Sequence, residues 1–92
     1  APVVVAKGVD VLALEIRKIA KTHKVVLIEV PPLARALYHN VPLGQPIPEA
    51  LYLAVAKVLA YVHDLRRAGV RVSRPHRVRG IRVPAEFKEA AT

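Results

Sequence analysis

The sequence predicts a small α/β domain in which a βαβ unit is packed with further helices. Three features indicate this class: two short valine-rich runs, an amphipathic segment between them, and a longer apolar helix downstream. The chain has 92 residues, of which 53% are hydrophobic, enough for one domain with a thin core. We expect residues 1–68 to form this domain and residues 69–92 to form a disordered, basic, proline-containing tail.

The predicted strands are residues 3–7 and residues 25–29. Unbroken apolar runs are typical of a parallel sheet covered on both faces, so we expect these strands to pair in parallel. The helix between them runs from Asp10 to about Lys21. Its predicted buried face consists of Leu12, Ile16 and Ile19. Two strands alone leave open edges, and we therefore expect a further strand from a segment upstream of this chain.

A short helix is predicted directly after the second strand. Pro31 and Pro32 end the strand and preset the backbone for a helix that runs to about Tyr38. Its predicted buried side consists of Leu33, Ala36 and Leu37. A stiff loop with three prolines then leads to the longest helix.

The longest predicted helix spans about residues 49–67 and is apolar on more than one side. One stripe, predicted to be buried, consists of Leu51, Val55, Val58, Val62 and Leu65. A second apolar stripe consists of Tyr52, Ala56 and Leu59. Such a helix must be covered on two sides or expose an apolar groove.

The net charge of +8 is concentrated near the C-terminus, where seven arginines lie in an acid-free arm from Arg66 to Arg82. A basic arm of this kind can bind nucleic acid, anionic lipid or acidic protein. It contains no aromatic residue, although nucleic-acid readers usually add them, and a solvated tail is the simpler interpretation. A small nucleic-acid-binding protein is the alternative function, and a steep fall of affinity with salt would distinguish it.

The residue inventory offers no constellation for catalysis, metal binding or a cofactor. Cysteine is absent, the four histidines are far apart, and Ser73 is the only serine. We therefore expect no catalytic residue, no metal site and no cofactor. The sequence also has no apolar run of the roughly 20 residues that span a bilayer, and its first residues do not form a signal peptide.

Four blocks in a fixed order carry a resemblance to a known family. They are Ala-Pro-Val-Val-Val-Ala-Lys-Gly at residues 1–8, Pro-Pro-Leu-Ala-Arg-Ala-Leu-Tyr at residues 31–38, Gly-Gln-Pro-Ile-Pro-Glu at residues 44–49, and the helix at residues 51–62. Together they resemble the C-terminal cytoplasmic domain of the FlhB/YscU family of type III export proteins, over about residues 1–67. The arginine- and proline-rich tail is more similar to the flagellar members than to the injectisome members.

The resemblance implies a domain at the cytoplasmic face of the bacterial inner membrane that binds export substrates and takes part in substrate-specificity switching. The implied partners are rod- and hook-type substrates, the hook-length control protein, other cytoplasmic domains of the export gate and the upstream cleaved segment. The family's self-cleaving Asn-Pro-Thr-His loop is absent, because the only asparagine, Asn40, precedes Val41. We expect neither enzyme activity nor nucleic-acid binding from a member of this family that lacks the loop.

The resemblance also implies two sets of site residues. Ala1, Pro2, Ala56 and Leu59 match an apolar patch that the family offers to substrates, and Tyr52 belongs to the same stripe. The second set, expected to face the cleavage loop, consists of Pro31, Pro32 and Arg35. Arg35 is a candidate to bind a carboxylate there, and a solvated arginine is an equal alternative.

Overall fold

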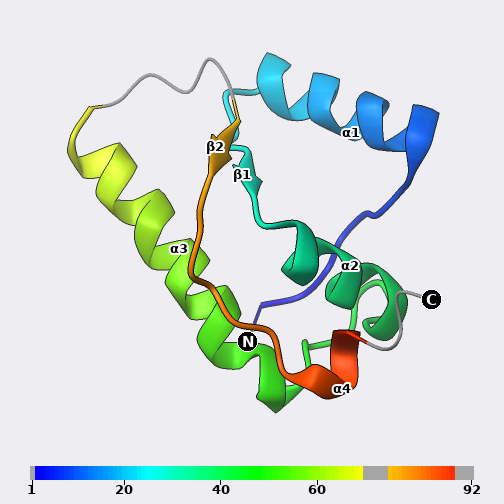
Figure 1. Cartoon of the computed structure of the whole chain (residues 1–92). Helices are drawn as coiled ribbons and strands as arrows, with labels where there is room; N and C mark the ends of the chain where they lie inside the picture. Colours follow the sequence, from blue (N-terminus) through cyan, green and yellow to red (C-terminus); the bar gives the residue numbers. More distant parts are fainter. Residues whose placement is uncertain (1, 70–74, 89–92) are drawn as a thin grey trace.

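The computed structural model describes residues 2–69 and residues 75–88. The elements in chain order are α1 (Asp10–Thr22), β1 (Ile28–Glu29), α2 (Pro31–Asn40), the 3-10 helix η1 (Glu49–Leu51), α3 (Tyr52–Arg67), β2 (His76–Arg77) and α4 (Ala85–Lys88). Figure 1 shows α1 along one edge of the molecule and α3 along another, with the strands and α2 between them. The predicted helix bounds agree with α1, α2 and the continuous η1–α3 segment.

The sheet is a short parallel pair in which Ile28 lies opposite His76 and Glu29 lies opposite Arg77. The predicted α/β class with a parallel pair is therefore confirmed, but the pairing partner predicted for the second strand was wrong. Residues 3–7, all of them described by the structure, form no strand beside β1. Instead, Val3 makes an isolated antiparallel bridge with Pro46.

The side chain of Lys7 accounts for the different path of the N-terminal segment. Its ammonium group donates hydrogen bonds to the carbonyl oxygens of Tyr38, at 2.8 Å, and Val41, at 2.6 Å. The last carbonyls of a helix have no partner within the helix, so a cation at this end is favourable. Together with the backbone bonds from Gly44 and Ile47 to the carbonyls of Val4 and Pro2, these bonds hold the N-terminal segment beside the end of α2 and the loop that follows. The position beside β1 is occupied by β2.

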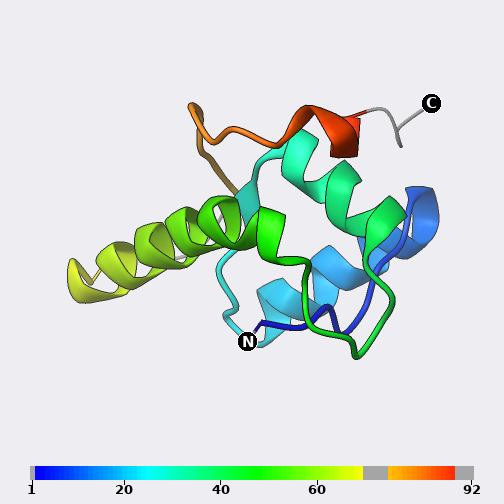
Figure 2. The same ribbon diagram turned by 90° about the horizontal axis from the view of Figure 1, so that it is seen from below.

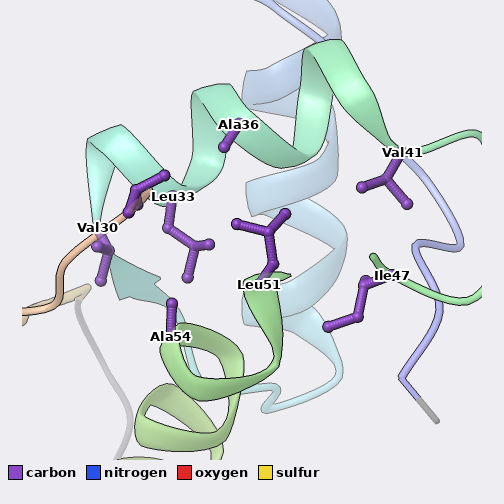
Figure 3. Packing of buried hydrophobic residues seen from close by; sticks show 8 residues of the cluster. Val30, Leu33, Ala36, Val41, Ile47, Leu51 and Ala54 are labelled. Atoms are coloured by element: carbon purple, nitrogen blue, oxygen red, sulfur yellow. The ribbon is translucent and has the colours of Figure 1, made fainter. Parts of the chain in front are cut away.

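The core lies between α2 and the start of α3. Its buried side chains are Val30, Leu33, Ala36, Val41, Ile47, Leu51, Ala54 and Val83. Figure 3 shows Leu51 between the side chains of α2 and Ile47. Leu51 is fully buried, and Val55 and Val58 pack partly buried against the same cluster, as the first stripe of the long helix predicted.

The predicted buried face of α1 was largely wrong. None of the residues of α1 is buried, and Leu12 and Ile19 are 56% and 53% exposed. The half-buried side chains are Ala13, Ile16 and Ala20, so the inward side is rotated around the helix from the predicted one. Only one of the three predicted residues, Ile16, faces inward, because α1 is covered on one narrow side.

The segment after α3 is not free of the domain where the structure describes it. Residues 75–88 fall in the predicted flexible tail, yet β2 pairs with β1, α4 contacts α2, and Val83 is 5% exposed in the core. The expectation of an unattached tail therefore does not hold for residues 75–88. The rest of that expected tail, residues 70–74 and 89–92, lies outside the described residues.

Candidate functional site

An exposed apolar stripe runs along α3, formed by Tyr52, Ala56 and Leu59. Steps of four and three residues place these side chains on one side of the helix. Tyr52 is 45% exposed and Leu59 is 53% exposed, whereas Ala54 on another side of the same helix is 3% exposed. The helix is thus held by its buried side and presents the stripe to solvent.

The start of α3 is held in place by the loop that precedes it. Ile47 is buried in the core, and the backbone N–H of Leu51 donates to the carbonyl of Pro48 at 2.9 Å, which closes the first turn of η1. Leu51 itself is fully buried. Because both the loop and the first turn are anchored in the core, the orientation of the stripe is fixed at this end. Figure 2 shows that the other end of α3 extends away from the remaining elements.

Pro2 lies beside this anchored loop. Its carbonyl accepts a hydrogen bond from the backbone N–H of Ile47 at 3.2 Å, and the carbonyl of Val4 accepts one from Gly44 at 2.8 Å. These bonds place the exposed Pro2 next to the residues that lead into η1. Ala1, the remaining predicted member of the patch, lies outside the described residues.

The second predicted set lies elsewhere, at the start of α2. Pro31 and Pro32 line a hollow of about 270 Å³ together with Arg77 and Arg79, and Arg35 is exposed one turn further along α2. The residues that line this hollow do not include any member of the α3 stripe. The described members of the two predicted sets therefore lie on different elements, with the second set at the start of α2 and away from the α3 stripe.

Another hollow lies between α1 and α2. It has a volume of about 290 Å³ and is lined mainly by apolar side chains, among them Val4, Ile16 and Leu37. The gap shows why α1 buries so little: its inward side approaches α2 without filling the space between them. The ion pair between Arg17 and Glu29, at 3.5 Å, adds an exposed contact between α1 and β1.

The chemistry that the described residues offer is apolar contact and positive charge. In residues 2–69 and 75–88, no group of three His, Asp or Glu side chains could hold a metal ion. No helix in this part of the chain is long and apolar enough to cross a membrane.

Sequence reasoning missed two groups of residues. Lys7, which fixes the N-terminal segment, gave no signal in the sequence beyond its charge. The segment from His76 to Val83 did carry a signal, because its arginines alternate with apolar residues as in a half-buried strand. The many arginines instead led to the prediction of a disordered tail.

Comparison with known proteins gives a consistent assignment. A family model described as the FlhB HrpN YscU SpaS family matches residues 1–62. The flagellar biosynthetic protein FlhB of Salmonella typhimurium is 57% identical over 67 residues, which cover 73% of this chain and 18% of that protein. The FlhB protein of Bacillus subtilis is 54% identical over 67 residues, covering 73% of this chain and 19% of that protein.

Two matches extend further toward the C-terminus. FlhB of Buchnera aphidicola subsp. Schizaphis graminum is 42% identical over 91 residues, covering 95% of this chain and 23% of that protein. The crystal structure of the cytoplasmic domain of FlhB from Shewanella putrefaciens matches with a TM-score of 0.79 and 43% identity, over 90% of this chain and 64% of that one. The chain spans less than a quarter of the length of these curated relatives. Since the family model matches most of the sequence and the relatives agree with it, the chain belongs to the FlhB HrpN YscU SpaS family.

Proposed function

We propose that this chain is part of the cytoplasmic domain of a flagellar type III export protein and acts at the cytoplasmic face of the bacterial inner membrane. Two findings support this proposal: the curated relatives are flagellar biosynthetic proteins, and the matching solved structure is a cytoplasmic domain. The chain contains no Asn-Pro-Thr-His sequence, and the role proposed for its residues is binding.

The site proposed to bind export substrates consists of the α3 stripe of Tyr52, Ala56 and Leu59, together with Ala1 and Pro2. The observation that carries this proposal is the exposure of an apolar stripe on a helix whose other side is fixed in the core. Burying one apolar side chain of a substrate supplies about 1.5–3 kcal/mol before ordering costs. A few such contacts give weak, reversible capture, which suits a module that handles many unfolded substrates in turn.

The proposed partners follow from this site and from the family. Rod- and hook-type export substrates would occupy the stripe, and the hook-length control protein would act through the same domain when substrate specificity switches. Other cytoplasmic domains of the export gate are proposed as neighbours. The upstream cleaved segment is proposed to add a strand to the two-stranded sheet, since a pair of two-residue strands is marginal alone.

The direct test introduces a charge into the stripe of the full-length protein in its flagellated host. Ala56→Asp places a carboxylate where a substrate side chain is proposed to be buried, and desolvating an unpaired charge is strongly unfavourable. Motility and the amount of hook-type protein in the medium should both fall to a small fraction of the wild-type values. Circular dichroism of the purified domain should show unchanged helix content, because Ala56 is exposed.

Ala85→Asp is the matched control, because it makes the same substitution at an exposed alanine, at the start of α4 and outside the stripe. This variant should swim and export at wild-type levels. Wild-type motility and export in the Ala56→Asp variant would contradict the proposed binding site, even though the family assignment would stand.

A further inference from the structure

Residues 76–83 form an extended segment that we name the arginine strap. Along it, the side chains of His76, Val78, Ile81 and Val83 are turned inward and buried to varying degrees. Arg77, Arg79 and Arg82 are exposed on the other side. Strict alternation would turn the residue at position 81 outward, but Gly80, with a φ of +83°, lets the chain shift its phase by one residue. All three arginines therefore share the outer side.

The backbone beneath these arginines is fixed at both ends. The N–H groups of His76 and Val78 donate to the carbonyls of Leu27, at 2.8 Å, and Glu29, at 3.1 Å. At the other end, Val83 is 5% exposed in the core. In an extended chain, alternate residues are about 6.6 Å apart. The spacing of Arg77 and Arg79 therefore matches the spacing of alternate side chains in an extended peptide bound alongside them.

Among the described residues, the strap arginines form no ion pair, and Glu29, which lies opposite Arg77 in the sheet, pairs with Arg17 instead. The ion pair formed within residues 2–69 and 75–88 joins Arg17 and Glu29, which belong to α1 and β1. The prolines at the first two positions of α2 offer no backbone N–H to an anion in the neighbouring hollow, and α2 has no acid in its first turn. An anion in this hollow would therefore be bound by the arginine side chains.

Two hollows adjoin the strap, one along residues 77–81 and one at residues 82–84, and they differ in character. Arg77 and Arg79 line the one at the start of α2, which has a volume of about 270 Å³. Arg82 lines the other, of about 490 Å³, whose remaining walls are largely apolar and include Leu53 and Ala54. Leu53 is 68% exposed, so this hollow offers an uncovered apolar contact directly beside a cation.

We propose that the arginine strap and the hollow over Leu53 form a docking site for an acidic peptide segment of another protein. An apolar side chain of the peptide enters the hollow, and its carboxylates lie along Arg82, Arg79 and Arg77. Arginine binds carboxylates with two parallel hydrogen bonds, and its planar head suits an extended, exposed row. The three outward arginines have no aromatic residue between them on which nucleic-acid bases would stack. The site does not include the α3 stripe and goes beyond the proposed capture of substrates.

A binding assay with a defined probe tests this proposal. The probe is a fluorescent synthetic peptide, Leu-Ser-Asp-Ser-Asp-Ser-Asp, whose aspartates stand two residues apart, as Arg77 and Arg79 do. Two matched peptides replace either the aspartates by asparagine or the leucine by alanine. Fluorescence anisotropy with the complete chain should show binding of the first peptide and binding at least about fivefold weaker for each of the other two.

Variants of the chain assign the binding to the strap. Arg79→Glu should weaken binding at least about fivefold, and Leu53→Asp should do the same, because one loses charge attraction and the other loses apolar contact. Lys18→Glu makes the same charge change on α1 and should alter affinity by less than about twofold at physiological salt, where distant charges are screened. Leu59→Asp, in the α3 stripe, should leave affinity unchanged, which separates this site from the proposed substrate site. Circular dichroism checks that each variant is folded.

The proposal is overturned if Lys18→Glu weakens binding as much as Arg79→Glu, or if Leu53→Asp and the alanine peptide have no effect. It is also overturned if phosphatidylserine vesicles or a single-stranded RNA compete with the peptide as strongly as unlabelled peptide does. Either competitor would show that the strap attracts any polyanion. Competition by a peptide of residues 89–92 alone would assign the hollow to the chain's own C-terminal end and would likewise overturn the proposal.

Discussion

Helices α1 and α3 both carry apolar side chains in contact with solvent, but they are supported very differently. In α3, Ala54 is 3% exposed within the core, and the preceding Leu51 is fully buried. In α1 no residue is buried, and Leu14 is 66% exposed. A hollow of about 290 Å³ lies between α1 and α2. The exposed apolar side chains of α3 thus belong to a helix that is anchored in the core. Those of α1 are exposed because few other residues pack against that helix.

The difference matters for identifying a binding site. An apolar stripe on an anchored helix presents its side chains at fixed positions, so a partner need not order the helix on binding. An apolar face on a loosely packed helix must first be ordered, and part of the binding free energy is lost to that. This is the physical reason to assign substrate capture to the α3 stripe.

The largest expected effect separates the anchor of α3 from the surface of α1. Leu51→Ala should lower the free energy of unfolding by about 2–5 kcal/mol, because it leaves a cavity at a fully buried position. The matched change on α1, Leu14→Ala, should alter it by less than about 0.5 kcal/mol. Urea denaturation followed by circular dichroism measures both. Similar losses for the two variants would contradict the comparison.

A smaller effect is expected at the N-terminal segment. Lys7→Met removes the hydrogen bonds from the ammonium group to the carbonyls of Tyr38 and Val41 and should cost about 1–3 kcal/mol of unfolding free energy. Lys18→Met, at an exposed position of α1, should change it by less than about 0.5 kcal/mol. Thermal and urea denaturation provide the readout. An unchanged stability of the Lys7→Met variant would show that these bonds do not hold the segment in place.

The smallest of the three stability effects concerns the arginine strap. Val83→Ala removes two buried carbons and should cost about 1–2 kcal/mol, whereas Val5→Ala, at a residue that is 82% exposed, should cost less than about 0.5 kcal/mol. Amide hydrogen exchange should also speed up at the N–H groups of His76 and Val78, which bond to β1. Equal stability of the two variants would indicate that the strap is not part of the core.

Local patterns in the sequence were sufficient to predict α1, α2 and the η1–α3 segment, whereas α4 falls in the expected tail and was not predicted. The prolines at the start of α2 and the apolar spacing from Leu51 to Val58 agree with the structure, because both act through neighbouring residues. The same spacing predicted that Tyr52, Ala56 and Leu59 share one side of α3. Their use as a substrate site stays a prediction.

What the sequence did not reveal depends on contacts between distant residues. The strand predicted to pair with β1 was wrong, because the N-terminal segment is held elsewhere by distant residues. Lys7 hydrogen-bonds to Tyr38 and Val41, which lie 31 and 34 positions further along the chain, and the spacing of apolar residues does not indicate such a contact. The prediction of the inward side of α1 was wrong, because the spacing of apolar residues identifies an apolar face but does not show how much of it another element covers. The segment around Val78 was assigned to a tail because its many arginines indicated disorder. Its alternation of arginine and apolar residues, which is typical of a strand, was given less weight.

The central claim is that substrates bind the anchored stripe of α3 and not any exposed apolar helix. The most direct test is photo-crosslinking in the full-length protein in exporting cells, with a photoreactive residue placed at Leu59 or at Leu14. Both positions are exposed leucines, one on each helix. Hook-type substrate should crosslink to the protein labelled at position 59 and only at background level to the protein labelled at position 14. Equal crosslinking from the two positions, or crosslinking from position 14 alone, would contradict the account.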